Sequence, residues 1–114
     1  MNTLRNRVNL IGHLGQNPEI KKFDNNKQKA SFSVATTEFY KDAKGNKASS
    51  TQWHNLVAWD HMAEIAEKHL SKGSEVSIEG KLTSRSYEDK EGKTRYITEV
   101  VVNEILLIKS RKEN

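Results

Sequence analysis

The chain has 114 residues and a net charge of +4, which is enough sequence for one domain. Leu, Ile, Val and Phe form 22% of it, so we expect a thin core that subunit contacts would help to complete. The absence of cysteine excludes disulfide scaffolds, thiol nucleophiles and zinc ribbons. No stretch is apolar enough to span a membrane, and the N-terminus lacks the apolar region of a signal peptide, so we expect a cytosolic protein.

The basic excess lies in the first half of the chain. Residues 1–57 carry a net charge of +5, whereas residues 58–114 carry −1. This balance is compatible with a polyanionic partner such as nucleic acid, but charge alone does not separate that partner from simple solubility.

Alternating apolar residues predict strands at residues 5–14 and 30–37, and further strands are expected at 19–23, a short one, and at 51–59. Gly12 falls in the apolar register of the first strand, which predicts a bulge or a close approach of backbone. Phe23 and Phe32 are expected in the core because they also fall in apolar register. The polar segment 38–50 predicts a long exposed loop or ribbon.

The period then becomes helical from residue 61 to residue 70, with Asp60 as the expected N-cap and Gly73 as the left-handed residue past the end. Glu64 and Lys68 are spaced for an ion pair one turn apart. Strands are predicted at 75–87 and 94–102, joined by a hairpin tip at 89–92. The apolar run 105–108 predicts a strand end that is buried on both sides or lies at a subunit contact.

One short helix among glycine-punctuated strands predicts an all-β OB-fold. We expect a five-stranded Greek-key barrel with one short helix and an extended hairpin loop. The barrel domain should span residues 1–108, followed by a short polar C-terminal end at 109–114.

Most of the aromatic residues lie among polar or charged neighbours, namely Phe39, Tyr40, Trp53, Trp59, Tyr87 and Tyr96. Rings stack on unpaired bases of any sequence while Lys and Arg neutralise the backbone, so this pattern favours binding of single-stranded nucleic acid. The alternative is that Trp53 and Trp59 fill a β core, and composition weighs the two equally. No metal-ligand spacing or catalytic motif occurs, so we expect no enzymatic activity, metal or cofactor.

Several segments together carry a resemblance to a known family: Gly12-His-Leu-Gly-Gln-Asn-Pro-Glu19, Trp53-His54, Lys72-Gly-Ser74 and Ile78-Glu-Gly-Lys-Leu82. The chain resembles the bacterial single-stranded DNA-binding proteins, the SSB family, from residue 5 to about residue 103. The resemblance implies an OB-fold that binds and protects single-stranded DNA without sequence preference in replication, recombination and repair. It also implies a homotetramer associated with the nucleoid in the bacterial cytoplasm.

The resemblance further implies roles for individual residues. The family's DNA-stacking positions fall on Tyr40, Trp53, Trp59 and Tyr87, and its phosphate-contacting positions fall on Arg7, Lys21, Lys72 and Arg85. His54 falls near the family's subunit contacts. Two stacking positions that commonly hold Trp hold Tyr here, and that of Trp59 commonly holds Phe, so altered stacking strength is expected.

Family members usually continue into a flexible linker and an acidic tip that docks replication and repair enzymes. This sequence stops at Ser110-Arg-Lys-Glu-Asn114, so we expect a trimmed chain or a short natural member, and docking through a tail is in doubt. Two other functions stay open. An SSB-like primosome or accessory protein would be a dimer poorer in stacking Trp, and a nuclease domain would need clustered carboxylates or histidines.

Overall fold

The computed structural model describes residues 3–111, in which six strands surround a core capped by one helix. A short 3-10 helix (η1, Thr3–Arg5) precedes β1 (Val8–Leu14), β2 (Glu19–Lys22), β3 (Gln28–Lys41), β4 (Lys47–Trp59), α1 (His61–His69), β5 (Glu75–Glu88) and β6 (Thr94–Lys109). The order of strands and helix is as predicted, although the first strand begins at Val8 rather than at residue 5. No helix within residues 3–111 is long and apolar enough to cross a bilayer.

The strands close into a barrel because β1 pairs on both of its sides. The sheet order is β1-β5-β6-β4-β3-β2, and a further pairing joins β1 to β3 through His13–Ala35 and Leu14–Val34. Strands β4 and β6 run parallel, as the third and fifth barrel strands of an OB-fold do, and β2 is added at the edge of β3. The predicted five-stranded barrel with one helix is confirmed.

Closure of the barrel depends on the glycine at position 12. A Cβ on Gly12 would overlap the backbone carbonyl of Ala35 and come within 2.9 Å of the Val34 side chain. The predicted close approach of backbone is therefore confirmed, and it lies where β1 leaves β5 and meets β3.

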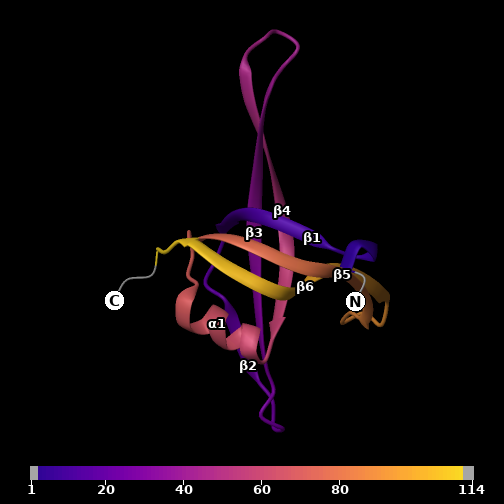
Figure 1. The fold of residues 1–114 in the computed structure, drawn as a ribbon. Helices are drawn as coiled ribbons and strands as arrows, with labels where there is room; N and C mark the ends of the chain where they lie inside the picture. Colours follow the sequence, from indigo (N-terminus) through magenta and orange to yellow (C-terminus); the bar gives the residue numbers. More distant parts are fainter. Residues whose placement is uncertain (1–2, 112–114) are drawn as a thin grey trace.

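The core is formed by the inward-facing residues of each strand and by the small residues of α1. Its largest fully buried side chains are Leu56, Ile78, Val34 and Val76, and Ala63 and Ala66 bring α1 close to them. Figure 1 shows α1 beneath the barrel, beside β2. Phe32 is buried as predicted, but the prediction for Phe23 is wrong, because its side chain is 37% exposed.

The helix begins after Asp60, but the Asp60 side chain does not cap it. Its carboxylate instead accepts a hydrogen bond of 3.2 Å from the backbone N–H of Gln28, and its own N–H donates to the Gln28 carbonyl at 2.8 Å. Gly73 has a φ of +88°, the left-handed conformation expected past the helix end. The predicted Glu64–Lys68 pair forms at 3.0 Å and lowers the pKa of the Glu64 carboxyl below its usual value.

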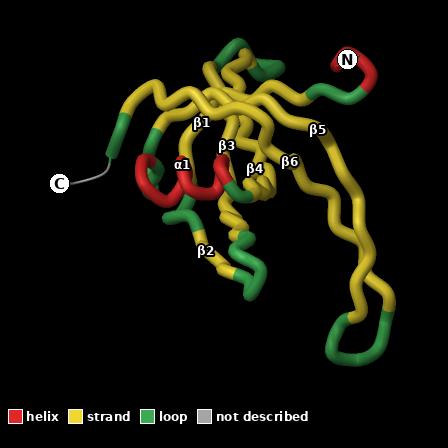
Figure 2. Tube along the Cα trace, turned by 60° about the horizontal axis from the view of Figure 1, so that its bottom comes forward, coloured by secondary structure: helices red, strands yellow, loops and turns green. Residues whose placement is uncertain are grey.

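Two hairpins extend beyond the barrel. The β3–β4 ribbon stands well clear of the barrel in Figure 1, which confirms a ribbon rather than a loop for residues 38–50, and the β5–β6 ribbon projects in Figure 2. Each tip is an Asp-x-x-Gly turn in which the carboxylate of Asp42 or Asp89 accepts two backbone N–H groups at 2.9–3.0 Å. Gly45 and Gly92 supply the positive φ that each turn requires.

The apolar run at 105–108 continues β6 as a regular strand. Ile105 and Leu107 pack against the core, whereas Leu106 and Ile108 alternate with them and remain exposed. Burial on both sides is therefore wrong for the single chain, and the subunit-contact interpretation stays a prediction. Of the predicted polar end at 109–114, residues 112–114 lie outside the described residues.

Candidate nucleic-acid interface

The two tryptophans lie on the outer face of β4. Successive side chains of a strand point to opposite faces. Leu56 and Ala58, at even positions of β4, point into the core, so Trp53 and Trp59, at odd positions, point outward. The four predicted stacking residues, Trp59, Tyr87, Tyr40 and Trp53, are 42%, 47%, 53% and 61% exposed. The interpretation of Trp53 and Trp59 as core residues is therefore wrong.

The Trp53 ring lies against the backbone at Gly15, just after β1. A Cβ on Gly15 would overlap this ring and lie 2.9 Å from Trp53 Cη2 and 3.1 Å from Ser33 Oγ. The Gly15 N–H donates to the Ser33 carbonyl at 3.1 Å, which holds this turn against β3. The missing side chain lets the indole rest on the main chain while most of its surface stays open to solvent.

Trp59 ends β4 beside the start of β3. Three hydrogen bonds between Asp60 and Gln28, one of them from backbone to backbone, fix this end of the strand. Trp59 pairs across the sheet with Lys29, whose ammonium lies 5.8 Å from the indole centroid. The Trp59 ring also stacks with Phe23, with centroids 6.1 Å apart and planes 23° apart.

A depression on this face joins β3 and β4 to β5 and β6. Lys29, Ser31, Asn55, Arg85 and Glu99 are among its lining residues. Arg85 Nε donates to Glu99 Oε1 at 2.9 Å, and half of the Arg85 side chain remains exposed. Glu99, which is 8% exposed, thus holds one edge of the guanidinium and leaves the rest available to a ligand in the depression.

Tyr87 lies on the same face of β5 as Arg85, two residues along the strand. Its cross-strand neighbour is Arg95, whose Nε donates to Asp89 Oδ2 at 2.9 Å. That hydrogen bond, followed by the one from the Lys93 N–H, lowers the pKa of the Asp89 carboxyl below its usual value. The β5–β6 tip thus carries a ring and a cation in one short segment.

Tyr40 does not share the face of the tryptophans. The β3–β4 register runs without a bulge from Lys29–Trp59 to Lys41–Lys47, so Phe39, not Tyr40, has the outward parity of Trp53. Tyr40 lies near the end of the ribbon, where it lines a shallow depression with Phe39, Lys41 and Lys47. The structure therefore separates this predicted stacking residue from the other three.

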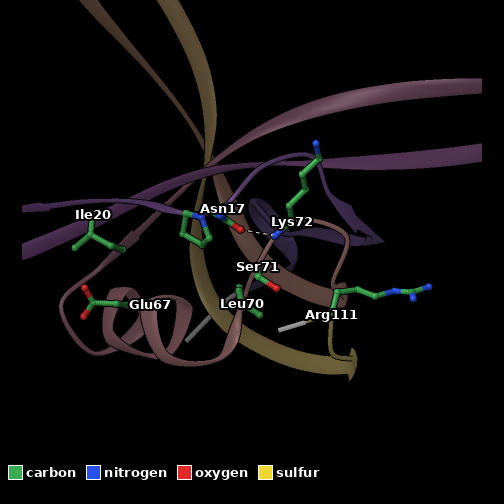
Figure 3. Close-up of a pocket in the computed structure, with 8 residues that line it drawn as sticks. Asn17, Ile20, Glu67, Leu70, Ser71, Lys72 and Arg111 are labelled. Atoms are coloured by element: carbon green, nitrogen blue, oxygen red, sulfur yellow. Dashed lines mark hydrogen bonds between the residues drawn. The ribbon is translucent and has the colours of Figure 1, made fainter. Parts of the chain in front are cut away.

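Arg7 and Lys72 also lie away from the rings. Arg7 is next to Glu79, 3.5 Å from Nε to Oε1, in a depression on the outer face of β1, β5 and β6. Lys72 lies in a fourth depression, drawn in Figure 3, where its N–H donates to Asn17 Oδ1 at 2.8 Å. The Lys72 and Arg111 side chains extend in different directions there, so they do not converge on one anion.

Lys21 and His54 complete the predicted set. The Lys21 ammonium is 5.3 Å from the Phe23 centroid, which places it in the same cluster as Trp59. His54 shares the inward parity of Leu56, and its Nε2 is hydrogen-bonded to Thr36 Oγ1 at 2.9 Å. The structure thus places Lys21, Trp53, Trp59, Arg85 and Tyr87 on the outward faces of β2, β4 and β5, whereas Arg7, Tyr40, His54 and Lys72 lie elsewhere.

Phe23 and Lys29 also belong to this surface, although neither was predicted as a site residue. The available signal was the strand alternation itself, because Ile20 takes the core position in β2 and Phe23, three residues later, takes the opposite face. Chemically, the surface offers stacking faces and cations. Within residues 3–111, no three His, Asp or Glu side chains come together as metal ligands.

Known proteins share this fold and much of this sequence. The model of the single-strand binding protein family matches residues 5–108. The single-stranded DNA-binding protein of Neisseria meningitidis is 40% identical over 109 residues, covering 96% of this chain and 63% of that protein. Single-stranded DNA-binding protein 1 of Chlorobaculum tepidum is 41% identical over 104 residues, covering 90% of this chain and 64% of that protein.

A solved structure described as the Plasmodium falciparum SSB complex with ssDNA superimposes with a TM-score of 0.82. Its sequence is 30% identical, and the match covers 91% of this chain and 95% of that one. The chain spans 63–64% of the length of the two bacterial relatives. On the family model and these relatives, the chain belongs to the single-strand binding protein family.

Proposed function

We propose that this protein binds single-stranded DNA without sequence preference, by stacking bases on exposed rings and pairing phosphates with Lys and Arg. The observation that carries the proposal is the outer face on which Trp53, Trp59 and Tyr87 stand exposed beside Lys29 and Arg85. Each stacked base contributes ~1–3 kcal/mol, so three rings suffice for tight binding. The family membership and the ssDNA-bound structural relative support the same conclusion.

The stacking mechanism predicts a preference for single strands over duplex. In a duplex, both faces of each base are covered by its neighbours in the stack, so the rings have nothing to contact. The remaining attraction to duplex would come from the cations alone and would be strongly reduced by salt.

We also propose that the protein assembles as a homotetramer. Ile11 and Leu106 are both exposed and both lie opposite Ser77, so they align in one row across β1, β5 and β6. Ile108 extends this apolar surface, and apolar residues gathered on an exposed face favour contact with another protein surface. Light scattering at micromolar concentration should give the tetramer mass. A monomer would contradict the proposal, and a stable dimer would favour an accessory role.

The proposed setting follows from where single strands arise. The protein would coat DNA exposed during replication, recombination and repair, at the nucleoid in the bacterial cytoplasm. Residues 1–108 would act as one DNA-binding domain, with His54 near a subunit contact. The activity proposed is binding, with no covalent step and no cofactor.

A titration that follows Trp fluorescence tests the proposed function. Adding oligo-dT should quench Trp53 and Trp59 and saturate at micromolar or lower concentration. The same oligonucleotide annealed to its complement should bind much more weakly at equal salt. Equal affinity for the duplex and for its separated strands would contradict the stacking mechanism.

A further inference from the structure

Phe23 and Trp59 form a pair of rings that is open to solvent. Phe23 follows the end of β2, Trp59 ends β4, and their centroids lie 6.1 Å apart with planes inclined by 23°. Phe23 is 37% exposed and Trp59 42% exposed, so each ring retains surface that a ligand can cover. A base inserted between two rings needs about 7 Å, twice the ordinary van der Waals contact distance of about 3.5 Å. The pair is therefore closed to insertion and offers its outer surface.

Two lysines accompany the ring pair. Lys21 lies directly opposite Lys29, and Lys29 lies directly opposite Trp59, so the three form one row across β2, β3 and β4. The Lys21 ammonium is 5.3 Å from the Phe23 centroid and the Lys29 ammonium is 5.8 Å from the Trp59 centroid. Like charges directly opposite on neighbouring strands repel each other. Within residues 3–111 neither lysine takes part in a salt bridge, so the repulsion is not compensated by a carboxylate.

This combination suits one nucleotide of a single strand. A base has an apolar face that can cover the outer surface of the rings. The phosphate of the same nucleotide is negatively charged and can pair with the two ammonium groups. A phosphate between Lys21 and Lys29 would relieve their repulsion, and a charged hydrogen bond to phosphate is stronger than an exposed cation–π contact.

We propose that Phe23 is a base-stacking residue that extends Trp59 into a two-ring platform, and that Lys29 joins Lys21 in binding the adjacent phosphate. The inference rests on the proposed function, single-stranded DNA binding, and adds two contact residues to it. The competing explanation is that Phe23 only supports the Trp59 ring and never contacts DNA. The two explanations differ in what Phe23 does once Trp59 has been removed.

A double-mutant cycle with oligo-dT separates them. Phe23→Ala should weaken binding about five- to hundredfold, and it should still weaken binding at least about fivefold in the Trp59→Ala background. A second variant, Phe23→Leu, keeps apolar bulk beside Trp59 and removes the aromatic face, so it should also weaken binding. Tyr96→Ala is the matched control, because this exposed ring lies on the opposite face of the β5–β6 ribbon from Tyr87, and its binding should stay within about twofold of wild type.

Phe23→Leu with wild-type affinity, or Phe23→Ala without effect in the Trp59→Ala background, would overturn the role of Phe23. For the lysine, Lys29→Ala should lower the salt dependence of oligo-dT binding by about 0.7 in log–log slope, and an unchanged slope would overturn the phosphate contact. If wild-type protein failed to bind oligo-dT at all, the proposed function itself would fail. Melting temperatures measured on the same variants establish that each is folded when it is titrated.

Discussion

Substituting Gly15 by alanine should displace the Trp53 ring without removing it. The added Cβ would overlap the indole and lie 2.9 Å from Trp53 Cη2. Ordinary contacts between carbon atoms begin at about 3.5 Å, so the ring must move by roughly 1 Å. The affected atoms are the far end of a side chain that is 61% exposed, and the ring can swing toward solvent. Positive-φ glycines in the structure are Gly45, Gly73 and Gly92, so the backbone at position 15 accepts alanine without strain.

These facts separate the effect on binding from the effect on stability. The free energy of unfolding should change by less than about 0.5 kcal/mol, as for other surface substitutions. Complete loss of the ring in Trp53→Ala should weaken oligo-dT binding by ~1–3 kcal/mol, about five- to hundredfold. A displaced ring retains part of its stacking, so Gly15→Ala should weaken binding by an intermediate factor of roughly two to ten.

Oligo-dT titration of Gly15→Ala, Trp53→Ala and the double variant, with urea unfolding of each, measures both effects. In the Trp53→Ala background, Gly15→Ala should add no further loss of affinity, because the ring it displaces is gone. Equal losses in both backgrounds would refute the reasoning, as would wild-type affinity of Gly15→Ala alongside weak binding of Trp53→Ala.

Three other substitutions test the barrel, the buried carboxylate and the β5–β6 tip. Gly12→Ala should destabilise the fold by about 1–3 kcal/mol or more in urea unfolding, because its Cβ meets the Ala35 carbonyl rather than a movable side chain. Arg85→Ala should lower the free energy of unfolding by about 1–3 kcal/mol in the same assay, because it leaves the nearly buried Glu99 carboxylate without this partner. An Arg85→Ala variant as stable as wild type would contradict the importance of this pair. Arg95→Met should raise the pKa of Asp89 toward its ordinary value of 3.8, as measured by a carboxyl NMR titration. Because the pKa of Asp89 is lower in the folded wild-type protein than in the unfolded chain, Asp89 stabilises the fold above the unfolded pKa. That stabilisation is lost as the pH falls through the folded pKa.

The elements of this chain could be predicted because each has a local signal. Alternation marked most of the strands, the helical period marked residues 61–70, and Asp89 and Gly92 marked the β5–β6 hairpin tip. Phe23 was misplaced because both it and Ile20 were candidates for the core. Ile20 holds the core position of β2, and Phe23, three residues later, therefore takes the opposite face. Asp60 was expected to cap the helix, but its carboxylate instead accepts a hydrogen bond from the backbone N–H of Gln28, 32 residues earlier in the chain.

The arrangement of the site could not be obtained from local signals. The row of Lys21, Lys29 and Trp59 depends on the register between three strands, and register is set by turn lengths and by which face is buried. The same register separates Tyr40 from Trp53 although both were matched to stacking positions. A family resemblance transfers positions along the chain, whereas the face that each position occupies requires the folded structure.

The salt dependence of oligo-dT binding, compared between a Trp53→Ala/Trp59→Ala double variant and Lys21→Ala, tests the central claim most directly. If rings and cations contribute separately, the double variant should lose at least about tenfold in affinity at every salt concentration and keep the wild-type slope. Lys21→Ala should instead reduce the slope by about 0.7, in line with one lost phosphate contact. A double variant that melts at the wild-type temperature and binds oligo-dT with wild-type affinity would contradict base stacking as the source of binding.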